Sequence, residues 1–325
     1  MSATERFLVT GSMGCIGAWV IRQLVAEGVD VVATDLATDP VRPRLLMDEK
    51  ALAAVDWQQL DVTDTEAVQS LVESNNINRI VHLAGLQIPF CKANPPGGAA
   101  VNVIGTINIL EAARHHGIKG LAYASSAAAF GTPDMYPETP IPDNAPLVSS
   151  NLYGVYKLAN EESARIYWQD WQVPSVGLRP YNVYGVGRDQ GLTSDIAKSI
   201  LATAAGRPFN IRYRGPLTLQ HAKDVAAIFI GCARSGLQGA QVCNLRNDVT
   251  TVEDFIVALK VVEPTADVTC SGDSLPFAYD FDDAGLKGLL GKVPHTSVQD
   301  AIKEDLAMYR QLVATDGIDM TQLDR

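Results

Sequence analysis

The chain has 325 residues, 47% of them hydrophobic, and a formal net charge of −11. This composition is that of a globular protein large enough for one domain with an appended lobe, or for two domains. The excess of negative charge works against binding to nucleic acids and to anionic membranes, so neither partner is expected.

Cysteines, histidines and apolar runs also exclude several classes of protein. The five cysteines include no C-x-x-C pair and the five histidines no H-x-x-x-H spacing, so neither a disulfide framework nor a metal site is expected. The first residues lead directly into a strand-like segment, and the longest apolar run, 225–233, is too short to span a bilayer. We therefore expect a cytoplasmic protein.

The first half of the chain alternates strand-like and helix-like segments. Helical periodicity follows the first strand and returns over 64–74 and 98–116. This alternation predicts an α/β fold, a doubly wound parallel sheet of the Rossmann type with helices on both faces. A segment with five prolines, 131–150, is expected to be a long surface loop. The predicted strands are 6–11, 30–35, 55–62, 79–85 and 120–126.

The second half is less regular and predicts a smaller mixed α/β lobe. Helices are expected over 194–206, 223–234 and 298–312, and strands over 208–213 and 240–245. We expect a nucleotide-binding domain over 1–180 and a substrate-binding lobe over 181–325, partly interleaved with the first.

A glycine-rich turn joins the first strand to the first helix. Gly11 can take a tight turn, Gly14 lets the backbone approach a pyrophosphate, and Gly17 allows the helix to pack closely on the strand. Asp35, at the end of the second strand, can accept hydrogen bonds from an adenosine ribose and would repel the extra phosphate of NADP. NAD is therefore the expected cofactor, although Arg42 and Arg44 could weaken that preference.

Two tyrosines precede a lysine in the sequence "NLYGVYKLANE" (151–161). On a helix, Tyr153 shares a face with Lys157 at i+4, whereas Tyr156 does not. An ammonium held beside a phenol favours the phenolate, which can take a proton from a secondary alcohol as its hydride leaves. The spacing therefore favours Tyr153 as a catalytic acid–base group.

Taken together, these motifs resemble the extended short-chain dehydrogenase/reductases, specifically the NAD-dependent epimerase/dehydratase branch. The resemblance spans the first 185 residues in the family's order and is weaker beyond them. It is carried by Asp35 and by the segments "VTGSMGCIG" (9–17), "LDV" (60–62), "VHLAG" (81–85), "VNVIGTINILEAAR" (101–114), "YASSAAAFG" (123–131), "YGVYKLANE" (153–161) and "LRPYNVYG" (178–185).

The resemblance implies roles for individual residues. Tyr153 would be the general acid–base, Lys157 would hold the nicotinamide ribose and lower the pKa of Tyr153, and Ser126 would hydrogen-bond the reacting oxygen, with Ser125 as the alternative. His82 is interpreted as structural. A homodimer through the helices at 98–116 and 151–170 is also implied. The expected cofactor-binding residues are Gly11, Gly14, Cys15, Ile16, Gly17, Asp35, Asp61, Val62, Leu83, Ala84, Gly85, Asn102, Tyr153, Lys157 and Pro180. The expected substrate contacts are Gln87, Ser126, Asn182, Arg188 and His221.

The reaction is narrowed by what the family's pattern lacks here. Dehydratases carry an Asp–Glu pair where this chain has Ala127 and Ala128, so dehydration is not expected. Nucleotide-sugar epimerases grip a diphosphate with an arginine where this chain has Leu217, and a second arginine near 271–277 is also absent. Arg188, Arg212, Arg214 and Arg246 are left as possible anion-binding groups. A cluster of them could bind a carboxylate or a differently placed phosphate.

These observations favour an NAD-linked dehydrogenase of a small sugar, sugar acid or polyol. The alternative is a sugar or nucleotide-sugar epimerase that works through a transient ketone. A third interpretation is a non-catalytic NAD-binding regulator, against which the presence of Tyr153, Lys157 and Ser126 argues.

Overall fold

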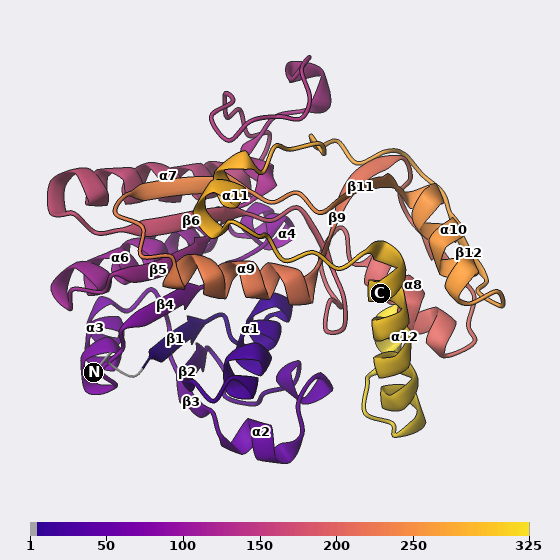
Figure 1. Ribbon diagram of the computed structural model, residues 1–325, viewed down its shortest axis with the longest axis horizontal. Helices are drawn as coiled ribbons and strands as arrows, with labels where there is room; N and C mark the ends of the chain where they lie inside the picture. The colour runs from indigo at the N-terminus through magenta and orange to yellow at the C-terminus, as the bar shows by residue number, and fades with distance from the viewer. Residues whose placement is uncertain (1–4, 325) are drawn as a thin grey trace.

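The computed structural model describes residues 5–324 and contains one large parallel sheet (Figure 1). Its strand order is β10–β6–β5–β4–β1–β2–β3, and all neighbouring strands run parallel. The predicted doubly wound α/β fold is therefore confirmed. The strands are β1 (Arg6–Thr10), β2 (Asp30–Asp35), β3 (Asp56–Gln59), β4 (Arg79–His82), β5 (Gly120–Ala124), β6 (Ser175–Arg179) and β10 (Ala240–Asn244).

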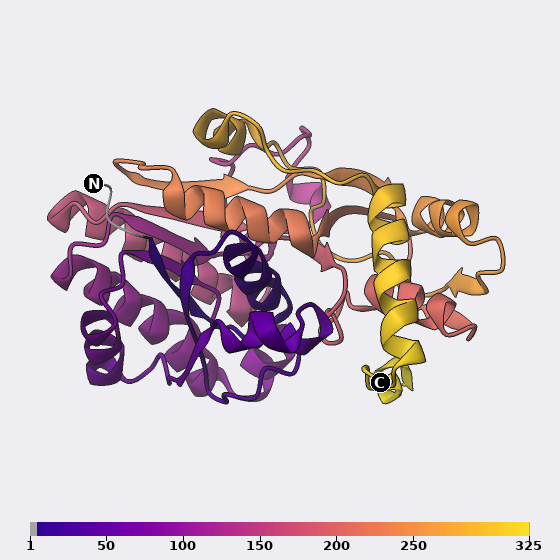
Figure 2. The same cartoon turned by 60° about the horizontal axis from the view of Figure 1, so that its bottom comes forward.

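Helices cover both faces of this sheet, which Figure 2 shows from below. Helices α1 (Cys15–Ala26) and α9 (Ala222–Arg234) pack together on one face, while α3 (Thr65–Ser74), α6 (Gly105–His115) and α7 (Leu152–Trp171) pack side by side on the other. Because both faces are covered, the central strands are apolar throughout: Phe7, Leu8 and Val9 of β1 are fully buried.

The predicted helix over 98–116 is present but is not regular. It consists of α5 (Pro95–Ala99), one turn of π-helix over Ala100–Ile104, and α6. The wider turn is centred on Asn102, whose side chain is fully buried. Such π-turns are frequent at functional sites because they displace a side chain from the regular helical position.

The C-terminal lobe is built from two small sheets and three helices. The sheets have the orders β11–β9–β7 and β12–β8. The elements of the lobe are β7 (Asn182–Tyr184), α8 (Asp195–Ala204), β8 (Phe209–Ile211), β9 (Pro216–His221), β11 (Asp248–Thr251), α10 (Val252–Val262), β12 (Val268–Cys270) and α12 (Val298–Ala314). Shorter helices are α2 (Glu49–Ala53), α4 (Ile88–Ala93) and α11 (Ala284–Leu290).

The two parts of the chain are interleaved more deeply than the predicted division at residue 180 implies. After β7, β8 and β9 the chain returns to the large sheet, where α9 covers β4 and β5 and β10 pairs with β6. A short apolar run such as 240–245 predicts a strand but not its neighbour, which is why its sheet could not be assigned from the sequence.

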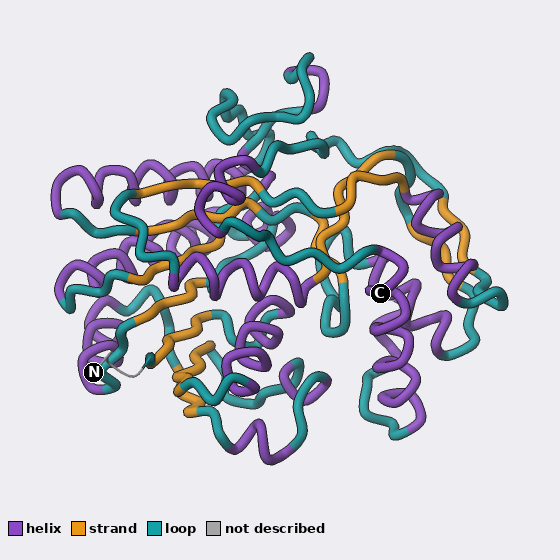
Figure 3. Tube along the Cα trace, in the orientation of Figure 1, coloured by secondary structure: helices purple, strands orange, loops and turns teal. Residues whose placement is uncertain are grey.

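The proline-rich segment 131–150 projects from the body as a loop with a single short helical turn, Pro133–Met135 (Figure 3). It is anchored at its base because the Tyr136 hydroxyl accepts from the Gly131 N–H at 2.9 Å and donates to the Pro146 carbonyl at 2.7 Å. Nowhere in residues 5–324 does a helix combine the length and the apolarity needed to cross a bilayer.

Candidate active site

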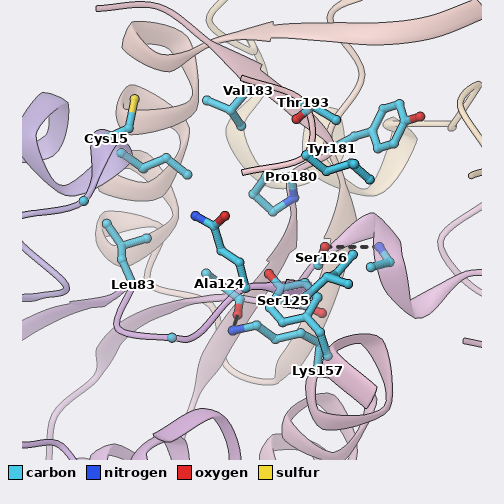
Figure 4. A pocket seen from close by; sticks show the side chains of 18 of the residues that line it. Cys15, Leu83, Ala124, Ser125, Ser126, Lys157, Pro180, Tyr181, Val183 and Thr193 are labelled. Carbon is cyan, nitrogen blue, oxygen red and sulfur yellow. Dashed lines mark hydrogen bonds between the residues drawn. The ribbon is translucent and has the colours of Figure 1, made fainter. Parts of the chain in front are cut away.

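A cavity opens at the carboxyl ends of the central strands, where the strand order reverses between β1 and β4. This is the position at which open α/β sheets bind ligands. Its wall includes the glycine turn, the start of α7 and the segment after β6 (Figure 4). Two further cavities adjoin it and share Gly14 and Gly85 with it.

The three glycines of the turn are required for different reasons. Gly11 has φ +68°, and a Cβ on it would stand 2.6 Å from the Ala84 nitrogen. A Cβ on Gly17 would stand 2.4 Å from the Gly11 oxygen. These two positions therefore need glycine for backbone packing.

Gly14 is different because packing does not explain it. A Cβ there would meet only the Gly11 oxygen, at 3.1 Å, yet Gly14 lines all three cavities. It is also the N-cap of α1 and offers no side chain to the first-turn amides. A bare helix N-terminus against a cavity is suited to a pyrophosphate, so the turn fits the expected dinucleotide.

One of these adjoining cavities is lined by the residues expected around adenosine. It is lined by Asp35, Asp61 and Val62 together with Leu83 and Ala84. The Asp35 carboxylate accepts from the Met13 N–H at 3.0 Å, which ties the end of β2 to the glycine turn.

The arginines after β2 are already engaged by carboxylates. Arg42 donates to the Met13 carbonyl at 2.6 Å and to Asp189 at 2.8 Å, and Arg44 pairs with Asp39. Both guanidinium groups therefore already have a carboxylate partner.

The catalytic candidates meet at the start of α7. Asn151 caps this helix by accepting from the Gly154 N–H at 3.0 Å, which places Tyr153 in its first turn. Lys157 lies one turn later, with its Nζ 5.6 Å from the Tyr153 ring centroid. Ser126 lies opposite, in a short turn that follows β5, where its Oγ accepts from the Ala128 N–H at 3.1 Å. The structure thus brings Ser126, Tyr153 and Lys157 to one cavity.

The electrostatics of Tyr153 differ from the expectation. Burial raises the pKa of the Tyr153 phenol, and a hydrogen bond from Ser126 and the charge of Arg188 oppose that rise only in part. The Lys157 ammonium makes its hydrogen bond to the Ala124 carbonyl, at 2.7 Å, and not to the Tyr153 phenol (Figure 4). Burial also lowers the pKa of Lys157 itself, to about 8.

Two serines follow β5, and their partners separate their roles. The Ser125 hydroxyl donates to the Glu161 carboxylate, which lies behind the site on α7. Ser126 makes no such hydrogen bond to a carboxylate, so its hydroxyl can turn toward a reacting oxygen.

His82 and Asn102 support the site from behind. The ring of His82 lies 2.7 Å from the Thr10 hydroxyl and 3.2 Å from the Thr106 hydroxyl, and burial lowers its pKa to about 3, so it links β1, β4 and α6 as a neutral group. Asn102 donates to the Leu86 carbonyl at 3.1 Å, while its Oδ1 has no partner and faces Gly85. Asn102 therefore lies next to the expected cofactor site but outside its lining.

Two of the predicted substrate contacts are buried and do not line this cavity. His221 is 1% exposed and pairs with Asp305 at 3.2 Å, in contact with the rings of Trp19 and Tyr184. Asn182 is also fully buried. The cause is strand alternation: Tyr181 and Val183 line the cavity, so Asn182 between them points to the opposite face.

Several other predicted residues line the cavity that contains Tyr153, and so do some residues that were not predicted. Gln87, Arg188, Cys15, Ile16 and Pro180 are in its wall. Sequence reasoning missed Tyr181, Leu192, Thr193 and Phe277, which are also part of the wall. Their spacing carried no signal, although Tyr181 lies within the "RPYNVYG" segment.

Apart from Arg188, the positions considered for binding a diphosphate or another anion place no arginine in the cavity wall. Leu217 is fully buried in β9 and cannot act as a polar contact. The other candidate cations are paired with carboxylates outside the cavity: Arg212 with Asp195, Arg214 with Glu253, and Arg246 with Asp280.

Comparison with known proteins identifies a family for most of the chain. The model of the NAD dependent epimerase/dehydratase family matches residues 7–244. A UDP-glucose 4-epimerase from Lacticaseibacillus casei is 33% identical over 217 residues, which are 64% of this chain and 62% of that enzyme. The match thus spans less than two thirds of that enzyme's length.

Solved structures extend the likeness over nearly the whole chain. An L-threonine dehydrogenase from Clostridium difficile has a TM-score of 0.83 at 18% identity and covers 97% of this chain and 99% of its own. A UDP-glucose 4-epimerase from Brucella ovis, solved in complex with NAD, has a TM-score of 0.78 at 20% identity and covers 94% of this chain and 98% of its own. At these identities the likeness establishes the fold.

Proposed function

Because the chain belongs to the NAD-dependent epimerase/dehydratase family of the extended short-chain dehydrogenase/reductases, and its cofactor is NAD, we propose that it is a net dehydrogenase. Its substrate is a secondary alcohol of a small sugar, sugar acid or polyol. One observation supports this proposal. The cavity contains Ser126, Tyr153 and Lys157, but Leu217 is buried at the position where nucleotide-sugar enzymes of the family have a diphosphate-binding arginine.

Bound NAD supplies the hydride acceptor. Gly14 and the α1 N-terminus would hold its pyrophosphate, Asp35 the adenosine ribose, and Lys157 the nicotinamide ribose. The Tyr153 oxygen, as phenolate, takes the proton of the substrate hydroxyl, while the C–H bond breaks and its electron pair leaves with the hydrogen as hydride. Because burial raises the pKa of Tyr153, alkaline pH favours this step. The Ser126 hydroxyl donates a hydrogen bond to the oxygen that becomes the ketone.

The test is absorbance near 340 nm after NAD in excess is mixed with the protein and a panel of sugars, sugar acids and polyols. We expect a steady rise with one class of compound. Tyr153→Phe should abolish this turnover and leave NADH binding, measured by fluorescence, nearly unchanged. A Tyr153→Phe variant that kept its rate would refute the assignment of the acid–base group.

An epimerase is the second candidate, supported by the names of the curated relatives. It would reduce the ketone again before release and would leave no NADH to accumulate. If absorbance stays flat while NMR records a change of stereochemistry in a panel compound, the epimerase is the correct function.

We also propose a homodimer that uses α6 and α7. Leu152 and Val155 are exposed at the start of α7, and Ile104 is exposed on the π-turn that packs against this helix. Light scattering coupled to size exclusion tests the assembly, and Val155→Lys should yield the monomer. The cytoplasmic location stays a prediction.

A further inference from the structure

The cavity of the proposed dehydrogenase contains a cation without a counter-ion. Arg188 follows β7 and is half-buried in the wall that also holds Tyr153 and Ser126. Its Nε is buried and has no hydrogen-bond partner. A buried donor without a partner is costly unless a ligand satisfies it.

The carboxylate nearest in sequence is not available to it. Asp189 is held by Arg42, which donates to its two oxygens at 2.8 and 3.1 Å. Across residues 5–324, only Arg22 and Arg188 are arginines without a carboxylate within ion-pair distance, and Arg22 instead lies over the ring of Trp19 outside this cavity. Arg188 is therefore singled out by position as well as by its missing partner.

The charge of the cavity points the same way. Among the described residues that line this cavity, the charged ones are Lys157 and Arg188, and none is Asp or Glu. The chain as a whole, by contrast, has a net charge of −11. The influence of Arg188 reaches the reacting centre, because its charge opposes the rise in pKa that burial causes at both Tyr153 and Cys15.

A second polar group stands beside the guanidinium. A Cβ on Gly191 would lie 2.6 Å from the Gln87 Oε1 and 3.0 Å from the Arg188 Nη2, so the two side chains converge over this glycine. Gly191 has φ +101°, a conformation that favours glycine, and the absence of a side chain leaves that space to Gln87 and Arg188.

We propose that Arg188, with Gln87 beside it, is a carboxylate-binding subsite, and that the substrate of this enzyme is a hydroxy acid. A guanidinium matches a carboxylate in a bidentate geometry, which fixes the distance between the acid group and the hydroxyl that reacts at Tyr153. A single arginine suits a monoanion better than a phosphate ester, for which more than one cation is usual. This inference rests on the proposed function and narrows its substrate to one of the three classes.

The first experiment compares compounds that differ only in the acid group. The three-carbon set is glycerate, glycerol and glycerol 3-phosphate, and longer pairs are threonate with threitol and gluconate with glucitol. We expect kcat/KM with NAD to be about 100-fold higher for the acid that fits than for its neutral partner, the effect of losing a charge-assisted contact. Equal rates for acid and alditol, or a preference for the phosphate ester, would overturn the subsite and leave the dehydrogenase intact.

If no compound in the panel is oxidised, the proposed function fails and binding still decides the subsite. Calorimetry of the protein loaded with NADH should show binding of an acid of the panel and none of its alditol. Absence of binding by every acid refutes the carboxylate site.

Variants separate the substrate from the cofactor, because Arg188 also lines the cavity next to the glycine turn. Arg188→Met should lower kcat/KM for the acid about 100-fold and leave the Kd of NADH within twofold. Arg188→Lys should lower kcat/KM for the acid about tenfold, because the positive charge stays but the bidentate geometry of the guanidinium is lost. Arg22→Met is the matched control and should change neither. If Arg188→Met instead weakens NADH and leaves the preference for the acid unchanged, Arg188 binds the pyrophosphate and the proposal is wrong.

Discussion

Replacing Arg179 with methionine should be among the most destabilising single changes in the nucleotide-binding domain. Arg179 ends β6, and its side chain is 4% exposed beside a Glu161 that is 5% exposed. It donates to the two oxygens of Glu161 at 2.8 and 2.7 Å, to the Asp143 carbonyl at 2.8 Å and to the Asn244 Oδ1 at 3.2 Å. One side chain thus joins β6, α7, β10 and the proline-rich loop.

The magnitude follows from what the substitution leaves behind. Methionine fills most of the volume, but the Glu161 carboxylate remains buried with only the Ser125 hydroxyl as a partner. Breaking a buried ion pair in this way costs about 3–5 kcal/mol of unfolding free energy. The matched control is Arg165→Met on the same helix, since the Arg165–Glu162 pair is 54% and 60% exposed and should contribute less than about 1 kcal/mol.

Urea denaturation followed by circular dichroism measures both variants. The double variant Arg179→Met with Glu161→Leu should recover much of the loss, because the unpaired charge is removed with its partner. The reasoning is refuted if Arg179→Met destabilises no more than Arg165→Met, or if the double variant is as unstable as the single one.

Three further predictions concern the active site and two glycines. Ser126→Ala removes a hydrogen bond that lowers the pKa of Tyr153 in the free protein, so the rise of the oxidation rate with pH should move to higher pH in a kcat/KM–pH profile. An unmoved profile would mean that Ser126 does not contact the phenol. Gly17→Ala places a Cβ 2.4 Å from the Gly11 oxygen and should weaken NADH at least about tenfold by fluorescence titration, whereas wild-type affinity would show that the turn tolerates the shift. Gly288→Ala on α11 meets nothing within 4 Å and should raise the unfolding free energy by about 0.5–1 kcal/mol, and a loss in the same assay would contradict the helical geometry.

The glycine turn, the strand–helix order and the pairing of Tyr153 with Lys157 were predictable because each depends on residues close together in the chain. The burial of His221 was not, because its partner Asp305 lies 84 residues away on α12. The direction in which the Lys157 ammonium points was also hidden, since it depends on the Ala124 carbonyl at the end of β5. The freedom of Arg188 could be recognised only after every neighbouring carboxylate had been placed.

The return of the chain to the large sheet has a consequence for biosynthesis. When residue 180 leaves the ribosome, β6 is an unprotected edge, and the surface of β4 and β5 that α9 later covers is open to water. The nucleotide-binding half can complete its sheet only after residue 244, the end of β10, has been made. By then three strands of the other lobe, β7, β8 and β9, have already been synthesised. A fragment cut at residue 180 should therefore be recovered as aggregate, and the nascent chain has a long interval in which a chaperone would find exposed apolar surface.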